Sequence, residues 1–111
     1  MTNQTVSQLS PAQAAARDDL LLVDVRGADE REETRAPQSV HIPLGQVEAQ
    51  LARLPRDRTI AFICRSGGRS GMAAEVAARR GLDVANVDGG MLAWEAAGLP
   101  TESGPETTKE R

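Results

Sequence analysis

The stretch TIAFICRSGGRS, residues 59–70, decides the fold class of this chain. Residues 59–63, apolar after the first, have the pattern of a strand that is buried on both faces of a parallel sheet. The run leads directly into Cys64, and two glycines then separate it from a helical period that begins at about Arg69 or Ser70. Strand, glycine loop and helix in this order predict one unit of an α/β domain.

The same alternation continues on both sides of this unit. Further strands are expected at residues 20–25, 40–42 and 84–87, with a brief one starting near residue 6, and helices at residues 12–17, 44–54 and 91–97. The charged segment 28–35 is expected to form a solvated helical turn. Alternating strands and helices imply parallel strands joined by right-handed crossovers, so the predicted fold class is α/β with helices on both faces of the sheet.

The length of 111 residues suits one domain, which we expect to span residues 1–100. Residues 101–111 are polar and have no apolar anchor, so a disordered tail is expected there. The net charge of -3, with both signs mixed along the chain, gives no basic surface for nucleic acid or for an anionic membrane. The first residues do not resemble a secretory signal, and the predicted location is the cytoplasm.

Cys64 is the single cysteine of the sequence, which excludes an internal disulfide, a Cys-x-x-Cys redox pair and a cysteine-rich zinc site. We therefore expect no metal and no cofactor, and any chemistry of the thiol must come from its neighbours. A lone cysteine in a globular domain is most often a buried, inert thiol, so the surrounding residues have to decide between the two roles.

Those neighbours favour a reactive thiol. In open α/β sheets, functional sites lie at the carboxyl ends of strands, which is where Cys64 is expected. Gly67 and Gly68 allow the loop to curl so that backbone N–H groups point inward, and the following helix adds the positive end of its dipole. Arg65 and Arg69 bring cations to the rim. Together these groups stabilise a thiolate, although a simple tight turn with solvated arginines is the alternative.

The sequence gives weaker evidence for a functional role of the other polar residues. Ser66 and Ser70 can each donate a hydroxyl to the sulfur or to a substrate, and Ser70 can also cap the helix. Asp24 and Arg26 end the second strand at the same edge of the sheet, so they are candidates for bracing the loop. The favoured alternative links Arg26 to a nearby acid such as Glu30 or Glu33. The single histidine, His41, is expected to be structural, and Met91 and Trp94 to be core residues.

Four segments of the sequence together resemble the signatures of a known family. Residues 64–70 resemble the active-site loop of rhodanese-like domains, and residues 24–26, 40–44 and 88–94 resemble its other signatures in the same order. The resemblance covers about residues 6–100. It implies a three-layer α/β/α domain with a central parallel five-stranded sheet and a sulfurtransferase that works by a ping-pong mechanism. Cys64 would take a sulfur atom from a donor such as thiosulfate and pass it, as a persulfide, to cyanide or a thiol. Residues 65–70 would bind the substrate.

Two other functions remain open. Cysteine phosphatases of the cell-cycle dual-specificity type, and arsenate reductases resembling them, use a Cys-x5-Arg loop around a tetrahedral phosphate. Four residues separate Cys64 from Arg69, which predicts a tighter cup that suits one sulfur atom better than a phosphoryl group. The second alternative is a non-catalytic or sulfur-relay domain that docks to a protein partner. The cysteine and loop glycines are intact, whereas inactive members of the family usually lack the cysteine.

Overall fold

The computed structural model describes residues 6–106 of the chain. Its strands are β1 (Ser7–Leu9), β2 (Leu21–Asp24), β3 (Val40–His41), β4 (Ile60–Ile63) and β5 (Val84–Val87). Its helices are α1 (Pro11–Ala16), α2 (Ala28–Glu33), α3 (Leu44–Gln50), the 3-10 turn η1 (Leu51–Arg53), α4 (Gly68–Arg79) and α5 (Gly90–Ala96). Strands and helices alternate along the chain as the sequence predicted.

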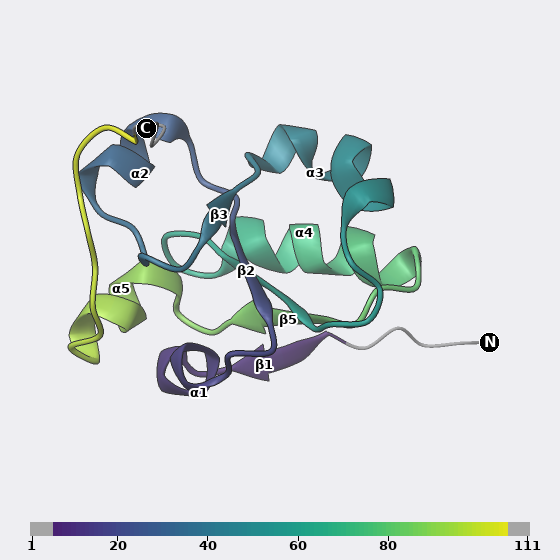
Figure 1. Cartoon of the computed structure of the whole chain (residues 1–111), viewed down its shortest axis with the longest axis horizontal. Coiled ribbons are helices and arrows are strands. Elements are labelled where there is room, and N and C mark those ends of the chain that lie inside the picture. Colours follow the sequence, from purple (N-terminus) through teal and green to yellow (C-terminus); the bar gives the residue numbers. More distant parts are fainter. Residues whose placement is uncertain (1–5, 107–111) are drawn as a thin grey trace, which may run out of the picture.

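The strands form one five-stranded sheet in the order β1-β5-β4-β2-β3, and all the pairings are parallel. Helices α3 and α4 cover one face of this sheet, and α1 and α5 cover the other (Figure 1). The predicted three-layer α/β/α architecture is therefore confirmed. Because β4 lies between β5 and β2, its carboxyl end is at the centre of the sheet edge, and Cys64 follows it directly.

The apolar run of β4 supplies core residues to both faces. Ile60 and Phe62 pack in the cluster that includes α3 and α4 residues, while Ala61 and Ile63 pack in the cluster that includes α1 and α5. All four side chains are fully buried. Trp94 of α5 is also fully buried, and its ring N–H donates to the carbonyl of Pro100 at 2.9 Å. Two-sided burial holds the end of β4 rigidly, which fixes the start of the Cys64 loop.

Helices α1 and α4 both begin slightly before the positions predicted from the sequence. Helix α1 begins at Pro11, one residue before the predicted start at residue 12, and Ser10 forms a capping box with Gln13 there. Helix α4 begins at Gly68, slightly before the predicted start at Arg69 or Ser70. Gly67 caps it with a φ of 113°, a conformation that glycine adopts without the steric cost of a side chain. The earlier start brings the N-terminal N–H groups of α4 closer to Cys64.

The segment around α2 differs from the prediction. A solvated turn was expected, but Arg31 and Arg35 are buried because they are paired with carboxylates and carbonyls. Some partners come from the segment 101–106, for which disorder was expected. Arg35 and Glu102 form an antiparallel bridge, and the N–H of Gly104 donates to the carbonyl of Glu32. Figure 1 shows this last segment running from α5 to α2. Polar contacts therefore replace the missing apolar anchor, and the rest of the predicted tail, 107–111, lies outside the described residues.

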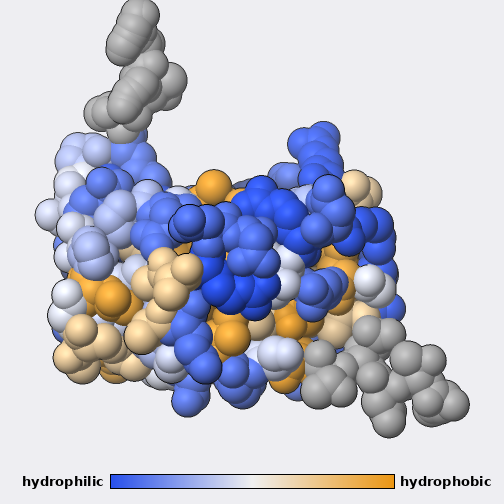
Figure 2. All heavy atoms as spheres, turned by 60° about the horizontal axis from the view of Figure 1, so that its bottom comes forward, coloured by the Kyte–Doolittle hydropathy of each residue, from blue (hydrophilic) through white to orange (hydrophobic). Residues whose placement is uncertain are grey.

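The face that carries α1 and β1 is mainly hydrophilic. Its hydrophobic residues form small patches separated by hydrophilic side chains (Figure 2). Within residues 6–106, no helix combines the length and apolar character that crossing a membrane requires. The visible part of this face thus offers no broad apolar surface for docking.

Candidate active site

The loop after β4 folds around the sulfur of Cys64. The backbone N–H of Gly67 donates to Sγ at 3.1 Å, and the N–H of Ser70 donates to it at 3.3 Å. The hydroxyl Oγ of Ser70 lies 3.2 Å from the same sulfur. Since Cys64 as a whole is only 1% exposed, these donors replace most of the water that a free thiol would contact. The loop forms a cup of hydrogen-bond donors around one atom.

The cup changes the acidity of the thiol. Burial is the largest effect and raises the pKa of Cys64, because it disfavours the charged form. The Ser70 hydroxyl and the backbone N–H groups of Ser70, Gly67 and Ser66 act in the opposite direction, and together they bring the pKa below its ordinary value. At a given pH, the lowered pKa gives Cys64 a larger share of thiolate, the nucleophilic form of cysteine, than an ordinary cysteine has. Within residues 6–106, the groups that donate to the sulfur are backbone N–H groups and a hydroxyl, which are dipoles, and no cationic side chain donates to it.

Asn86, on β5, ties Gly67 and Ser70 to the sheet. Its Oδ1 lies 2.5 Å from the Ser70 hydroxyl, and its Nδ2 donates to the carbonyl of Gly67 at 3.3 Å and to Gln8 at 3.2 Å. A hydroxyl has a single hydrogen, so Ser70 donates either to Cys64 or to Asn86 at one time. Asn86 was not predicted from the sequence. The available signal was a polar residue inside the otherwise apolar run 84–87.

The start of α5 supports the loop from behind. The N–H of Met91 donates to the carbonyl of Cys64 at 2.8 Å, and that of Leu92 donates to the carbonyl of Arg65 at 3.0 Å. Gly90 has a φ of 59°, and a side-chain carbon there would collide with the backbone of Cys64 and Arg65. The Gly-Gly pair at residues 89–90 therefore allows a close backbone approach. Met91 and Trp94 are buried, as predicted for core residues.

The two arginines of the loop have different surroundings. Arg69 donates from both terminal nitrogens to the carboxylate of Glu30 on α2, each at 2.8 Å. The hydrogen bonds from Arg69 are the main cause that lowers the pKa of Glu30 to about 2, and the N–H of Gly27 adds to it, against the effect of burial. The Arg65 side chain is exposed and has no hydrogen bond or ion pair among the described residues. Both arginines were expected at the rim, and Glu30 was expected only as a partner for Arg26.

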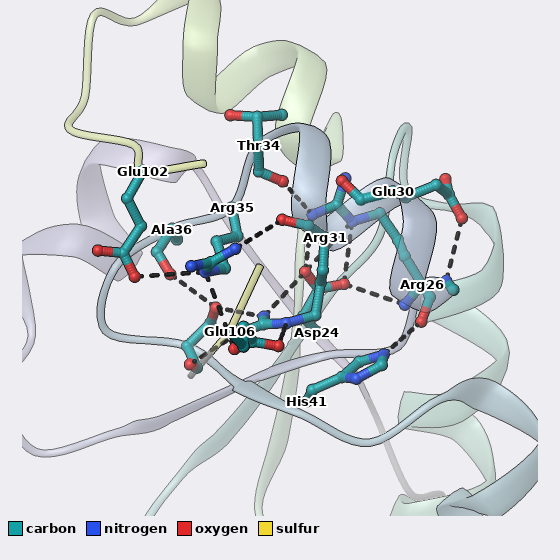
Figure 3. A network of polar contacts seen from close by, with 12 residues as sticks. Asp24, Arg26, Glu30, Arg31, Thr34, Arg35, Ala36, His41, Glu102 and Glu106 are labelled. Atoms are coloured by element: carbon teal, nitrogen blue, oxygen red, sulfur yellow. Dashed lines mark hydrogen bonds and ion pairs between the residues drawn. The ribbon is translucent and has the colours of Figure 1, made fainter. Parts of the chain in front are cut away.

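Asp24 and Arg26 belong to a buried polar cluster beside the loop (Figure 3). The Asp24 carboxylate accepts from Arg26 at 2.8 Å and from Arg31 at 3.2 Å, and Arg26 also donates to the carbonyls of Glu30 and Thr34. His41 is structural here, with Nε2 lying 2.7 Å from the carbonyl oxygen of Arg26. The contacts of Asp24 and Arg26 lead to α2, so this pair holds the helix that carries Glu30. The prediction that Arg26 pairs with Glu30 or Glu33 was wrong, because the carboxylate that pairs with Arg26 is Asp24.

Comparison with known proteins gives the family. The sequence matches the family described as "Rhodanese-like domain" over residues 6–97, which is most of the chain. The chain belongs to the rhodanese-like domain family. The putative sulfurtransferase YtwF of Bacillus subtilis is 40% identical over 85 residues, covering 77% of this chain and 82% of that protein. A sulfurtransferase of Allochromatium vinosum is 33% identical over 101 residues, covering 90% of this chain and 94% of that protein.

A solved structure supports this family assignment. The crystal structure of a rhodanese-related protein from Thermoplasma volcanium has a TM-score of 0.82 and 28% identity, and the match covers 86% of this chain and 97% of that one. The sequence relatives carry sulfurtransferase names, and together with the family match they support membership in a sulfurtransferase family. The chain is similar to these proteins over nearly its whole described length.

This rhodanese-like domain has a hollow of about 230 Å³ between α2 and α5. Arg65 of the loop lines it, together with Met91 and Leu92 of α5. Three carboxylates, those of Glu30, Glu33 and Glu95, lie around it as well. Among residues 6–106, no three side chains of His, Cys, Asp or Glu gather in a way that could hold a metal ion. The hollow therefore places one unpaired arginine and three carboxylates beside the loop.

Proposed function

We propose that this protein is a sulfurtransferase that carries the transferred sulfur as a persulfide on Cys64. The observation that carries this proposal is the cup of donors around Sγ, made of the N–H groups of Gly67 and Ser70 and the Ser70 hydroxyl. Dipoles preorganised in this way stabilise a sulfur anion, whether thiolate or persulfide, without a general base in the loop.

With thiosulfate as the donor, the Cys64 thiolate attacks the outer sulfur. The sulfur–sulfur bond of thiosulfate breaks, its electron pair leaves with sulfite, and Cys64 becomes a persulfide anion. In the second step, cyanide or a thiolate attacks the outer sulfur of that persulfide. The bond between the two sulfur atoms breaks, the acceptor takes the outer sulfur, and the Cys64 thiolate is restored. Neither step requires an external oxidant or reductant.

Each loop residue has a role in this proposal. The backbone N–H groups of residues 65–70 hold the sulfur, and Ser66 contributes its N–H. This arrangement needs the left-handed conformation of Gly67, whereas Gly68, which was also expected to need a positive φ, is the first residue of α4. Arg65 binds the sulfonate oxygens, and Arg69 does so when it is released from Glu30. A relative from Pseudomonas savastanoi is named a thiosulfate sulfurtransferase, which supports this donor. The proposed partners are small sulfur donors and thiol or cyanide acceptors, and a protein acceptor is a further option. The proposed location is the cytoplasm.

The test is an intact-mass measurement after incubation with thiosulfate. We expect the chain to gain the mass of one sulfur atom, reversibly on addition of a thiol, and to transfer sulfur from thiosulfate to cyanide. Cys64→Ser should abolish both the adduct and the transfer while the protein remains folded. Full activity of this variant, or no adduct on the unaltered chain, would overturn the proposal.

An aryl phosphate serves as the control substrate. A solved structure from Rhodopseudomonas palustris, 31% identical to this chain, carries the description "Possible Tyrosine Phosphatase". The short loop between Cys64 and Arg69 has room for few phosphoryl contacts, so we expect no turnover of the phosphate ester. Release of phosphate that depends on Cys64 would support phosphatase chemistry instead.

A further inference from the structure

The rim of the active-site loop has two guanidinium groups, and one of them is already neutralised. Arg69 makes a two-point ion pair with Glu30, in which both nitrogen–oxygen distances are 2.8 Å. A planar pair with two parallel hydrogen bonds is stronger and more precisely oriented than a single contact. Arg65, by contrast, has no ion pair with the described residues. Only one of the two arginines presents a free positive charge to an incoming anion.

Glu30 is held in place from three sides. Its Oε1 accepts the N–H of Gly27 at 3.1 Å, in a capping arrangement at the start of α2. Arg31, the next residue of the helix, donates to the buried Asp24. Arg26 donates to the backbone carbonyl of Glu30 at 3.3 Å. Since the helix cannot move away easily, Glu30 competes continuously with any anionic donor for the Arg69 guanidinium.

Two further carboxylates near Arg65 also repel an anionic donor. Glu33 and Glu95 line the same hollow as Glu30 and Arg65, and neither forms an ion pair among the described residues. A donor with two negative charges therefore meets one free guanidinium, two unpaired carboxylates and the Glu30–Arg69 pair; Arg26, which also lines the hollow, is paired with Asp24. Coulomb repulsion grows in proportion to the charge of the donor, so the dianion loses most.

We propose that Glu30 determines the charge preference of the sulfur donor: by pairing with Arg69, it disfavours dianionic thiosulfate relative to donors that carry one negative charge or less. The proposal rests on the proposed sulfurtransferase function. Glu30 acts through Arg69 and through its own field, so it is a positioning residue rather than a catalytic one. Donors with a single charge beside the transferable sulfur, such as thiosulfonates and organic persulfides, fit this rim better than thiosulfate does.

The experiment compares two donors that react in the same way but differ in charge. Thiosulfate carries two negative charges, and benzenethiosulfonate carries one. In both, the Cys64 thiolate attacks the outer sulfur, and sulfite or benzenesulfinate leaves with the electron pair of the broken sulfur–sulfur bond. For Glu30→Gln we expect the KM for thiosulfate to fall about tenfold and that for benzenethiosulfonate about threefold, with kcat changed by less than about twofold, because the Coulomb energy scales with donor charge.

Two matched variants separate charge from structure. Glu30→Asp keeps the negative charge and should keep the unaltered ratio of the two KM values. Glu32→Gln removes an exposed carboxylate from the same helix, and Glu32 neither lines the hollow nor contacts Arg69, so the KM values should change by less than about twofold. Raising the salt concentration should shrink the effect of Glu30→Gln, because ions screen it.

The possible failures are distinguishable. Thiosulfate binding is also measured by calorimetry on Cys64→Ser, with and without Glu30→Gln, which needs no sulfur transfer. If the unaltered protein takes no sulfur from either donor, the proposed function fails. If Cys64 takes up sulfur but Glu30→Gln leaves the KM ratio and the thiosulfate affinity unchanged, the charge preference is overturned while the function stands. A fall in kcat alone, with an unchanged KM ratio, would also overturn it.

Discussion

Two neighbouring regions at the carboxyl edge of the sheet each hold a buried acidic group, but they hold it by different means. Asp24 ends β2 and is fully buried, and Cys64 follows β4 and is 1% exposed. Asp24 is surrounded by the guanidinium groups of Arg26 and Arg31. The sulfur of Cys64 is surrounded by backbone N–H groups and one hydroxyl. The strands are adjacent and parallel, so the difference arises from the loops that follow them.

At this edge of the sheet, the Asp24 cluster and the Cys64 loop suit different roles. A carboxylate paired with two buried arginines has its charge satisfied, and removing one partner leaves a charge without compensation. Dipoles stabilise the thiolate but do not neutralise it, so its electron pair remains available to attack a sulfur atom. The Asp24 cluster therefore suits a permanent structural role, and the Cys64 loop suits a group that changes its bonding during a reaction.

The largest effect is expected from breaking the Asp24 cluster. Asp24→Ala would leave Arg26 and Arg31 buried without their shared carboxylate, and losing one partner of a buried ion pair costs about 3–5 kcal/mol. Urea unfolding measures this loss. Asp29→Ala, which removes an exposed acid on α2, is the control and should change stability by less than about 0.5 kcal/mol. A loss below about 1 kcal/mol for Asp24→Ala would show that the cluster is not structural.

An intermediate effect is expected from the backbone of the loop. Gly67 has a φ of 113°, where a side chain is strained, so Gly67→Ala should cost about 1–3 kcal/mol and distort the N–H group that faces Sγ. Sulfur transfer and unfolding free energy are both measured. Gly68→Ala is the matched control, because a side-chain carbon there meets nothing within 4 Å and its φ is ordinary for a helix. Equal effects of the two substitutions would contradict the role of the Gly67 conformation.

The smallest effect is expected from one hydroxyl. Ser70→Ala removes the side-chain donor to Sγ, so the pKa of Cys64 should rise towards its ordinary value. Because a lower pKa keeps the thiolate populated as the pH falls, the variant should lose thiol reactivity at a higher pH than the unaltered protein. A hydrogen bond to a charged group is worth about 1.5–3 kcal/mol, and the lower end applies because the Ser70 hydroxyl is shared with Asn86. Alkylation at pH 6 should therefore be about tenfold slower.

Iodoacetamide rates across a pH series check this prediction. Ser66→Ala is the control, since Ser66 contributes through its backbone N–H and its exposed side chain has no hydrogen bond among the described residues. Its profile should overlay that of the unaltered protein. Identical profiles for Ser70→Ala and the unaltered chain would mean that the hydroxyl donates to Asn86 in both states of the thiol.

Much of the fold could be predicted because its signals are local. The apolar runs, the Ser10 cap and the glycines at 67–68 and 89–90 each depend on a few consecutive residues, and the structure places strands, a helix cap and turns there. The polar partnerships could not be predicted in the same way. Glu30 and Arg69 are 39 positions apart, and Ser70 and Asn86 are 16 apart, so a single sequence carries no signal that joins them.

The tail illustrates the same limit. Glu102 and Glu106 look like solvated charges in the sequence, but they bind Arg35 and Arg31, which appear equally solvated by composition. The pKa of Glu106 is lowered chiefly by its hydrogen bonds from Arg31, a contact that exists only after the chain has returned to α2. Charged residues have many possible partners, and only the packing of α2 against the last segment selects among them.

By itself, the sequence determined the α/β class, the position of Cys64 at the end of a buried strand and the glycines that let the next loop curl around it, because periodicity and backbone conformation are properties of short segments. Tertiary structure decided which groups face each other at that edge: Asn86 behind Ser70, Glu30 against Arg69, and Asp24 between two arginines. The physical reason is that polar and ionic contacts depend on distances across the fold, which parallel strands and their crossover helices establish only when they pack together.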